Sequence, residues 1–511
     1  MFNDSGQVEY LLSRLTIFSV VAVFCILGII FGISIGDQNI LTPYLFFVLF
    51  FGVSLLLRMG EGAWILLVLG FSTQLPAIPL AGRTFEIPEL STMSLFAIFC
   101  ARMAFRVQKF YPFRAAYTGV VLYTLWAFFI YYLHPIGLFA MGSSMAGARF
   151  YFKILISFFA FLVLANQKIS NKQAKWAVIA TIAGVFLTAG WQIWEYFNTG
   201  TSSTLQIGED ESYYTWQQIL AQPPLYVILW LVCHYRMSEI FSLGRFYLMF
   251  IMAACDLTAF DSGKRAGVVV VLLVPIMVAF IRREWLYVVA MIVFLGGGIV
   301  FMVLGNGSLF DLPLRMQRVL VNLPGQWDRR VQSVTAGVSI DEFREGIRTV
   351  AYRRIKENPW IGPGFQINVV EMATFYSRQN LSKEDLYEGM AAGGNWHNTW
   401  LGMAADFGIP AAIFWGLFWA QCVYVGFRAW SLAEDKSWRK TLALMITLYQ
   451  ITQILRSWTS GHSSYSPFDM WWSYGLLLGI YYTILDEKKE LLEAPGSRER
   501  ADNKSLPATV S

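Results

Sequence analysis

The sequence predicts an all-α protein that crosses a membrane many times. Apolar residues make up 56% of the 511 residues and charged residues only 14%, which lies outside the range of soluble globular domains. The apolar residues are gathered into runs of about 20 residues, the length that one helix needs to span the hydrocarbon core of a bilayer. We count about fourteen such runs and therefore predict about fourteen transmembrane helices.

Roughly eleven of these helices fall within residues 1–304, which form a predicted N-terminal transmembrane region. The runs near 41–58 and 63–80 are the weakest, because only Gly60-Glu61-Gly62 separates the two. The first run is long and has no clear small-residue cleavage site, so we expect a retained span rather than a cleaved signal peptide. The runs lie near 15–35, 41–58, 63–80, 89–105, 115–133, 149–166, 174–194, 216–235, 243–260, 265–282 and 285–304.

A polar segment at residues 305–396 interrupts the apolar runs and is the largest predicted loop. Residues 397–485 then hold the remaining predicted helices, which lie near 398–427, 439–457 and 467–485. Residues 486–511 begin with charged runs and close on Ser, Pro and Thr. This composition predicts a short helix followed by a disordered tail.

The distribution of Lys and Arg predicts the orientation in the membrane, because short basic loops stay in the cytoplasm. Alternate loops carry about sixteen Lys and Arg residues, against roughly five on the loops between them. Both termini are therefore predicted to be cytoplasmic, and the loop at 305–396 to lie outside. The modest positive charge follows from this topology and does not indicate nucleic-acid binding. The basic residues of the predicted cytoplasmic loops are Arg58, Arg102, Arg106, Lys109, Arg114, Lys168, Lys172, Lys175, Arg236, Arg245, Arg282, Arg283, Arg428, Lys436, Arg439 and Lys440.

Basic residues are scarce on the predicted outer side, so each one there is a candidate for a specific role in binding. Lys264 and Arg265 follow Asp261-Ser262-Gly263 in a short outward turn, against the positive-inside bias. They either reach lipid headgroups or form an anion site, since a guanidinium can grip phosphate oxygens with two hydrogen bonds. Arg149, at the outer end of another predicted span, has the same two interpretations. Arg456 is similar, but it also follows Gln450 and Gln453 at helical spacing, so this polar stripe faces either a cavity or another helix to which it hydrogen-bonds.

Within the large loop, Arg344 begins a helical pattern that ends at Pro359. Apolar residues recur in it at helical spacing, which predicts one packed face and one solvated basic face. The following segment, Trp360–Phe365, is punctuated by Gly and Pro and predicts a turn. The apolar face consists of Ile347, Val350, Ala351 and Ile355, and the basic residues are Arg344, Arg348, Arg353, Arg354 and Lys356.

Neither the acidic residues nor the cysteines form a recognisable metal motif. Glu384, Asp385 and Glu388 could hold a divalent cation, but their spacing matches no tight ligand set. The five cysteines all lie in or beside apolar runs and show no CxxC pair. We interpret them as small core residues, because thiols are commonly buried in that way.

His397 stands where the large loop re-enters the membrane, directly before the next apolar run. A lone histidine usually has a structural role, but neutral imidazole is also the side chain best suited to accept a proton near pH 7. Asn398 either orients the ring or caps the helix that follows, and capping is the usual role of Asn there. Asp406, inside the apolar run, needs a partner or an aqueous face. Gly408 and Pro410 permit a close crossing or a kink.

Three segments together resemble the signature of the O-antigen ligase and polymerase superfamily. The first is Arg344 followed by Lys356-Glu357-Asn358-Pro359-Trp360-Ile361-Gly362-x-Gly364; the second is His397-Asn398-x-x-Leu401 followed by Asp406-x-Gly408. The third, Ser262-Gly263-Lys264-Arg265-Ala266-Gly267, is similar to the family's Ser-Arg-Gly/Ala turn with one inserted residue. The resemblance covers roughly 255–430. Asp406 replaces a more usual Glu, and Arg348 stands where Trp is common.

The resemblance implies a GT-C-like helical fold in the bacterial inner membrane and transfer of a glycan from undecaprenyl pyrophosphate to an acceptor hydroxyl at the periplasmic face. It implies that Arg265, Arg344 and Lys264 neutralise the departing pyrophosphate, where negative charge grows in the transition state, and that His397 is the general base. Arg149, Asn398, Arg348 and Arg456 are the remaining candidate substrate-binding residues. No metal, cofactor or nucleotide sugar is expected. The acceptor would be another lipid-linked glycan, for a polymerase, or a lipid A core or a protein, for a ligase, and a chain-length regulator is a candidate partner.

Two other classes of protein fit the hydropathy. A flippase for lipid-linked oligosaccharides, or another transporter, suits about fourteen spans, but transporters of this kind carry charges at the midplane and a two-fold repeat. Here the charges collect towards one face and no repeat is seen. A non-catalytic membrane scaffold is the other alternative.

Overall fold

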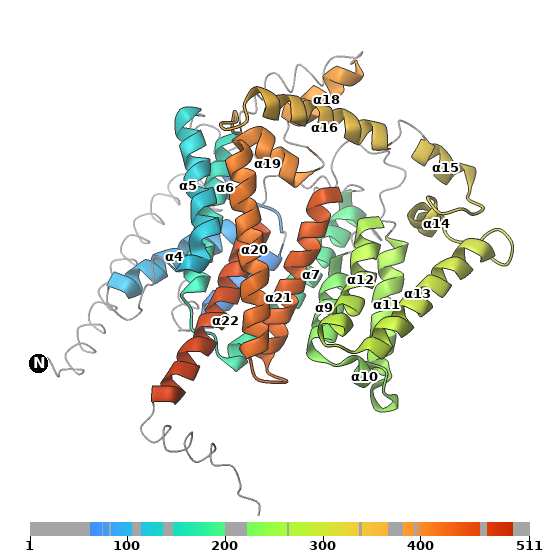
Figure 1. The fold of residues 1–511 in the computed structure, drawn as a ribbon, viewed down its shortest axis with the longest axis horizontal. Helices are drawn as coiled ribbons and strands as arrows, with labels where there is room; N and C mark the ends of the chain where they lie inside the picture. The colour runs from blue at the N-terminus through green and yellow to red at the C-terminus, as the bar shows by residue number, and fades with distance from the viewer. Residues whose placement is uncertain are drawn as a thin grey trace, which may run out of the picture. The chain divides into compact units, whose positions relative to one another are not determined.

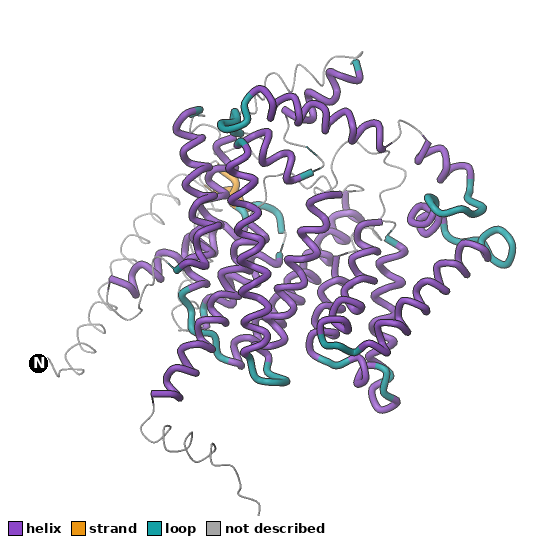
Figure 2. The backbone as a smooth tube through the Cα atoms, in the orientation of Figure 1, coloured by secondary structure: helices purple, strands orange, loops and turns teal. Residues whose placement is uncertain are grey.

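The computed structural model describes residues 62–73, 75–80, 83–104, 114–135, 147–199, 222–262, 265–336, 340–365, 382–392, 396, 398–459 and 468–493. The chain divides into two units, Met1–Ala63 and Trp64–Ser511, and the helices and strands named below belong to the second. The described residues of this unit are almost entirely helical apart from one two-stranded hairpin (Figures 1 and 2). The predicted helical fold class is therefore confirmed for the described residues. The predicted spans near 15–35 and 41–58 lie outside them.

The elements before the large loop follow the apolar runs of the sequence. They are α3 (Trp64–Ser72), β1 (Ile78–Leu80), β2 (Arg83–Phe85), α4 (Ile87–Ala104), η2 (Ala115–Tyr117), α5 (Thr118–Leu133), α6 (Gly147–Ala165), α7 (Asn171–Thr199), α9 (Gln222–His234), α10 (Met237–Ile240), η5 (Leu243–Arg245), α11 (Tyr247–Asp261), α12 (Arg265–Ile281) and α13 (Trp285–Gly305).

The elements of the large loop and of the C-terminal region are also helical. They are α14 (Leu314–Leu320), α15 (Arg329–Ala336), α16 (Ile340–Glu357), α18 (Lys383–Ala392), α19 (Thr399–Phe407), α20 (Ile409–Leu432), α21 (Trp438–Thr459) and α22 (Phe468–Glu493). By length and composition, the described helices long and apolar enough to cross a membrane are Ala115–Leu133, Asn171–Asn198, Trp285–Gly305 and Ile409–Leu432.

Two predicted spans differ from the structure. The run near 63–80 is not one helix, because α3 ends at Ser72 and the chain then forms the β1–β2 hairpin, in which Ile78 pairs with Phe85. The run near 398–427 is two helices, α19 and α20, separated at Gly408. Gly408 has φ +84°, a left-handed value that interrupts the helix and that residues other than Gly seldom adopt.

Close approaches between helices depend on glycine. In α22, Gly475 and Gly479 lie against the backbone oxygens of Phe161 and Leu164 of α6, where a side chain would collide with the neighbouring helix. Small residues of this kind let helix backbones pack tightly in membranes, where the contact between apolar surfaces alone gives little driving force. The α6–α22 pair is accordingly the most extensive helix contact among the described residues.

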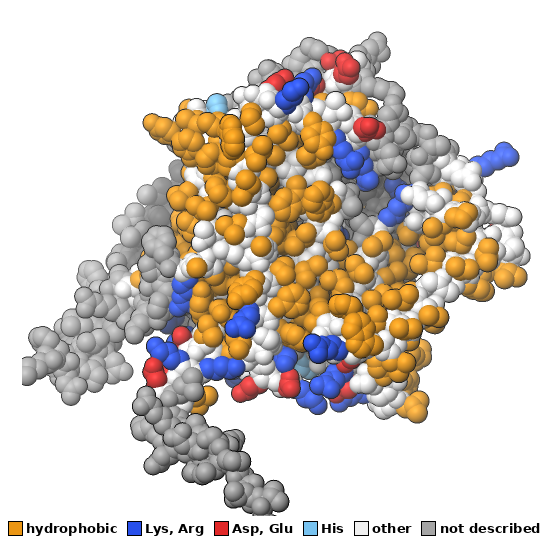
Figure 3. All heavy atoms as spheres, viewed as in Figure 1, with side chains coloured by type: hydrophobic (Ala, Val, Ile, Leu, Met, Phe, Trp, Pro, Cys, Tyr) orange, Lys and Arg blue, Asp and Glu red, His pale blue; other side chains and the backbone are white. Residues whose placement is uncertain are grey.

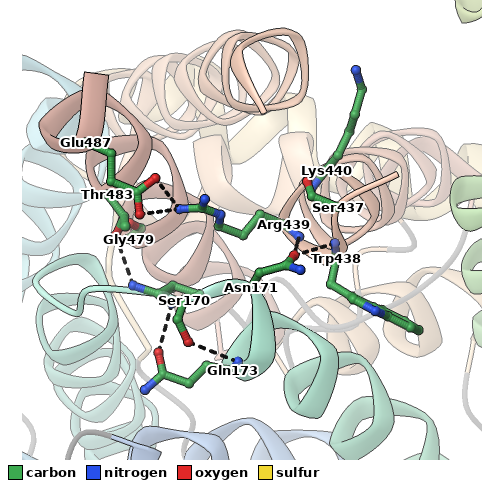
Figure 4. Close-up of polar contacts among 11 residues, drawn as sticks. Ser170, Asn171, Gln173, Ser437, Trp438, Arg439, Lys440, Gly479, Thr483 and Glu487 are labelled. Carbon is green, nitrogen blue, oxygen red and sulfur yellow. Dashed lines mark hydrogen bonds and ion pairs between the residues drawn. The ribbon is translucent and has the colours of Figure 1, made fainter. Parts of the chain in front are cut away.

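Several of the basic loops meet at one end of the bundle (Figure 4). The Oδ1 atom of Asn171, at the start of α7, accepts hydrogen bonds from the backbone N–H groups of Trp438 (2.6 Å) and Arg439 (3.3 Å), at the start of α21. The guanidinium of Arg439 pairs with Glu487 of α22 at 2.8 Å. Ile169, before α7, donates its N–H to Thr483 of α22.

Two more basic loops share this end. Arg282, after α12, donates to the carbonyl oxygens of Cys233 and Tyr235 at the end of α9, and His234 stacks on Trp438 with ring centroids 4.4 Å apart. Figure 3 shows Lys and Arg gathered along the lower edge of a broad apolar surface. The described loops before α7, after α9, after α12 and before α21, all of which the sequence assigns to the cytoplasm, therefore share one end of the bundle, called the basic end below. The side of the membrane that this end faces stays a prediction.

The helices of the large loop lie at the other end, called the loop end below. Figure 1 shows α16 running across the ends of the bundle helices rather than alongside them, with α10 and the α20–α21 turn at the far end. The predicted apolar face of α16 is buried: Ile347, Val350 and Ala351 form a cluster with Tyr387 of α18 and Ala405 of α19, and Ile355 packs against it. The helical spacing of the apolar residues predicts this face.

We predict that Gly408→Ala lowers the melting temperature of the detergent-solubilised protein strongly. Alanine at φ +84° costs about 1–3 kcal/mol, and its Cβ would also collide with the carbonyl oxygen of Trp360. Gly297→Ala in α13 is the matched control, because nothing lies within 4 Å of the added Cβ and alanine favours a helix over glycine by about 1 kcal/mol. Equal melting temperatures for the two variants would contradict this account.

Candidate functional site

The turn at Pro359–Phe365 is joined to the break between α19 and α20 by two backbone hydrogen bonds. The N–H of Gly364 donates to the carbonyl oxygen of Asp406 (2.7 Å), and the N–H of Ile409 donates to that of Pro359 (2.8 Å). A side chain at Gly362 would collide with the backbone of Asp406. The break exposes backbone groups that a continuous helix would satisfy, so the turn provides partners that the helices lack. These two segments are called the junction below.

Helices α5 and α6 hold the junction from the other side. The Nε1–H of Trp126, in α5, donates to the carbonyl oxygen of Phe407 at 2.8 Å. The ring of Tyr151, in α6, packs edge-on against Phe365 (5.1 Å) and Phe407 (6.2 Å), and these two rings lie 4.6 Å apart. The junction is thus enclosed by aromatic side chains from four segments that are far apart in the sequence.

Asp406 is 3% exposed, and its side chain accepts a hydrogen bond from the Nε1–H of Trp396 at 2.9 Å. Trp396 is itself only 2% exposed. The guanidinium of Arg354, in α16, lies over its ring, 5.2 Å from the centroid, a geometry in which a cation attracts an aromatic face. Trp396 is therefore fixed from two directions, by a carboxylate at the ring edge and a cation at the ring face. Asp406 thus has the partner that its place in an apolar run requires.

Asn398 caps α19, because its Oδ1 atom accepts the backbone N–H of Leu401 at 3.1 Å. Capping is the role that Asn most often takes at such a position. His397 and Lys264, two of the predicted site residues, lie outside the residues that the structure describes. The chain neighbours of His397 on both sides, Trp396 and Asn398, are described and buried.

Arg265 is the first residue of α12 and is half-buried at the loop end. Its Nε atom donates to the carbonyl oxygen of Arg318, in α14, at 2.9 Å. Helix α14 packs against both α11 and α12, so the first helix of the large loop is tied to the start of α12. This hydrogen bond restricts the orientation of the guanidinium.

Arg344 and Arg348 project from successive turns of α16. Arg344 is half-buried and Arg348 is exposed. Arg344 lies three residues before Ile347 and Arg348 directly after it, and the side chain of Ile347 is completely buried. The buried cluster of α16 therefore fixes the directions in which both guanidinium groups leave the helix.

Arg456 lies near the end of α21 and is half-buried. Its chain neighbour Ser457 accepts a hydrogen bond from the Nε1–H of Trp400, in the first turn of α19, at 2.9 Å. The rings of Trp400 and Trp458 stack with centroids 5.9 Å apart. The end of α21 and the start of α19 are thus joined directly, and Arg456 and Asn398 belong to the same part of the molecule.

Arg149, in the first turn of α6, forms a buried ion pair. Its Nη2 atom lies 2.5 Å from Glu89 Oε2 of α4, and the two side chains are 6% and 0% exposed. Lys153, one turn further along α6, pairs with Glu86 at 2.6 Å. Arg149 lies two residues before Tyr151, which contacts the junction.

The acidic residues of α18 contact cations and cap their own helix. Glu388 pairs with Arg353 and Arg354 of α16. Asp385 accepts hydrogen bonds from the hydroxyl and the N–H of Ser382, which precedes the helix. In the described part of the chain, no group of three His, Cys, Asp or Glu residues is arranged to hold a metal ion.

The structure brings most of the described candidates to the loop end. Helix α16 packs on α19, α19 on α21, α21 on α12 and α12 on α14, and this chain of contacts links Arg344 and Arg348 to Asn398, Arg456 and Arg265. Arg149 lies on the other side of the junction, beside α5 and α4.

Two features of the site were not predicted from the sequence. Glu89 was not singled out, although it is the carboxylate that pairs with Arg149; the signal was an acidic residue at the start of an apolar run, where it needs a partner. The sequence predicts no role for Trp396 beyond its place before His397. No local sequence pattern predicts that its indole donates to Asp406, because that contact depends on how the chain folds between the two residues.

These features define a helical membrane protein in which most of the described candidate residues, from the large loop and from the bundle helices, lie at the loop end. Residues 247–416 match the model of a family described as O-antigen ligase, which confirms the resemblance drawn from the sequence. The matched segment contains Arg265, Arg344, Asn398 and the whole junction. No curated protein matches the chain. The family match indicates a glycosyl-transferring enzyme of surface-polysaccharide assembly, which acts on a lipid-linked glycan and an acceptor.

We predict that Arg149→Ala loses about 3–5 kcal/mol of stability, because it leaves the carboxylate of Glu89 buried without its cation. The double variant Glu89→Gln, Arg149→Met removes both charges and should recover most of the loss. Thermal melting measures both effects. Melting of Arg149→Ala at the wild-type temperature would contradict the structural role of the pair. Glycan transfer by the folded double variant then decides whether Arg149 also binds substrate.

Proposed function

We propose that this protein transfers a glycan from an undecaprenyl-pyrophosphate carrier to an acceptor sugar hydroxyl at the periplasmic face of the bacterial inner membrane. The observation that supports the proposal is that the O-antigen ligase match covers the junction together with the helices that carry Arg265 and Arg344. The proposal includes a GT-C-like arrangement of about fourteen helices, with both termini in the cytoplasm and the loop end in the periplasm.

Cationic side chains at the loop end suit a departing diphosphate. Transfer breaks the bond between the anomeric carbon and the pyrophosphate oxygen, so negative charge grows on the leaving group. We assign its neutralisation to Arg265 and Arg344, assisted by Lys264, Arg348 and Arg456. Guanidinium groups suit this role because they bind phosphate oxygens in pairs and keep their charge at any physiological pH. The proposed chemistry requires no metal ion, cofactor or nucleotide sugar.

His397 is assigned as the general base. It would take the proton of the acceptor hydroxyl as that oxygen attacks the anomeric carbon from the side opposite the leaving pyrophosphate, with inversion at the anomeric centre. An imidazole that is neutral near pH 7 can accept this proton. The two chain neighbours of His397 have specific contacts: Asn398 caps α19 and Trp396 donates to Asp406.

The acceptor is either a second lipid-linked glycan or a lipid A core, and a chain-length regulator is a candidate partner for the first case. The two reactions leave different products on the carrier. Loss of long carrier-linked chains in a deletion strain would indicate a polymerase, and their accumulation would indicate a ligase. We favour the polymerase, because about fourteen predicted spans are more usual among polymerases of this superfamily than among its ligases.

Arg265→Ala and Arg344→Ala should each lower glycan transfer at least about 100-fold, which corresponds to about 2.7 kcal/mol of lost transition-state stabilisation. Membrane insertion should be unaffected, since both residues are partly exposed at the loop end. His397→Ala should lower transfer to a similar extent. The assay uses purified protein and a defined carrier-linked glycan donor.

Arg330→Ala is the matched control for these variants. Arg330 lies in the same loop but is exposed, and its guanidinium pairs with Asp328 beside it at 2.9 Å; its removal should leave transfer within about threefold of wild type, the scale of a surface ion pair worth up to about 1 kcal/mol. Full activity in either Arg265→Ala or Arg344→Ala would refute the assigned roles. Near-normal turnover by His397→Ala would mean that the histidine is purely structural.

The orientation can be tested separately with single cysteines and a maleimide that does not cross membranes. Arg348→Cys, at the loop end, should be labelled in spheroplasts, because this exposed position is predicted to face the periplasm. Lys436→Cys, in the α20–α21 turn at the basic end, should be labelled only after the membrane is opened. The reverse pattern would place the basic end in the periplasm and overturn the proposed side of the reaction.

A further inference from the structure

Asp406 is an acidic residue in the last turn of an apolar helix, and the proposed transfer assigns it no role. Its side chain is almost completely buried, and α19 leads directly into α20, which is long and apolar enough to cross a membrane. A buried carboxylate is costly unless it is paired or hydrogen-bonded. The structure gives the carboxylate a donor, the indole Nε1–H of Trp396 at 2.9 Å.

The carboxylate contributes a specific restraint on Trp396. Both partners are shielded from water, so breaking this hydrogen bond would leave a buried donor and a buried acceptor unpaired. A second restraint comes from the guanidinium of Arg354, which lies over the ring face and has Glu388 at 3.5 Å. The indole therefore can neither rotate nor withdraw without losing one of these two contacts.

Trp396 is adjacent in the chain to the proposed base. Consecutive Cα atoms are about 3.8 Å apart, so a displacement of Trp396 passes directly to residue 397. The other neighbour, Asn398, is fixed by its cap on α19. The described residues on either side of position 397 are thus each held, Asn398 by its cap on α19 and Trp396 by the indole–carboxylate bond.

Resting on the proposed function, we infer that Asp406 is a positioning residue for glycan transfer, which acts through Trp396 to hold the segment at the start of α19 that carries His397. Asp406 itself does not contact the reacting atoms. Asp406 also ties this segment to the junction, because its backbone carbonyl oxygen accepts a second hydrogen bond, from the N–H of Gly364.

A role in positioning should affect turnover more than substrate binding. The carrier pyrophosphate is assigned to arginines of α12 and α16, whereas the proton transfer is assigned to residue 397. A base displaced by about 1 Å can lose about 100-fold in rate. Loss of the Trp396 bond is therefore expected to lower kcat while the KM for the carrier-linked donor stays nearly constant.

The chain offers a closely matched pair of variants for the test. Trp396→Phe removes the indole N–H that reaches the Asp406 carboxylate. Trp126→Phe removes an indole N–H that reaches the carbonyl oxygen of Phe407, the next residue, at 2.8 Å. Both changes delete one tryptophan donor at the same helix break, but only the first concerns the segment before α19.

We expect Trp396→Phe to lower kcat about 10- to 100-fold with the donor KM within about twofold, and to change the pH dependence of kcat. Trp126→Phe should keep kcat within about threefold and the wild-type pH profile, with a similar small decrease in melting temperature, since each variant loses one hydrogen bond of typical strength. Equal effects of the two variants on kcat would overturn the inference, because the bond would then serve only to stabilise the break.

Variants of Asp406 keep the inference testable if Trp396→Phe does not fold. Asp406→Asn keeps the size of the side chain and an acceptor oxygen but removes the charge, and should reduce kcat. Asp406→Glu keeps a charged acceptor and should retain more activity than Asp406→Asn. If Asp406→Asn turns over as fast as wild type, the inference is wrong.

The failure of this inference and the failure of the proposed function give different results. An inactive wild-type protein, with a correct donor and acceptor, would refute the proposed function itself. An active wild type with an inactive His397→Ala and a fully active Trp396→Phe would refute only the positioning role. Full activity of His397→Ala would overturn the positioning role together with the assigned base.

Discussion

The site depends on a backbone pairing between the turn at Pro359–Phe365 and the break that separates α19 from α20. A helix interrupted inside a bundle leaves N–H and C=O groups without intrahelical partners, and in an apolar environment each such group is expensive. The turn supplies the missing partners through Gly364 and Pro359. It fits because Gly362 and Gly408 have no side chains where the two backbones meet. The large loop is consequently an integral part of the bundle.

This pairing helps to fix α16, the helix that carries Arg344 and Arg348. Helix α16 ends immediately before the turn, so its position across the bundle is fixed at that end by the junction and along its length by the packing of Ile347 and Val350. The family match covers the same stretch, 247–416, and extends to α12, where the other candidate arginine begins the helix. The matched segment therefore consists of helices that pack on one another or are joined through the junction. Its arginines belong to one connected part of the fold.

The sequence predicted those features that depend on local spacing. The apolar face of α16 followed from a helical period, and the need of Asp406 for a partner followed from a charge inside an apolar run. It did not predict which partner Asp406 would take, nor that the run near 398–427 would be two helices. Gly408 and Pro410 suggested a kink, but the break is stabilised by a turn that lies far away in the sequence. The pairing of Arg149 with Glu89 is equally non-local.

The pairing at the junction also has a consequence for how the protein is made. The turn at Pro359–Phe365 leaves the ribosome before Gly408 and α20, and it can complete the break only when both have reached the same end of the bundle. The break is therefore completed only after the whole stretch from the turn to the start of α20 has been synthesised. Until then the carbonyl oxygen of Asp406 and the N–H of Ile409 lack the partners that they have in the folded protein.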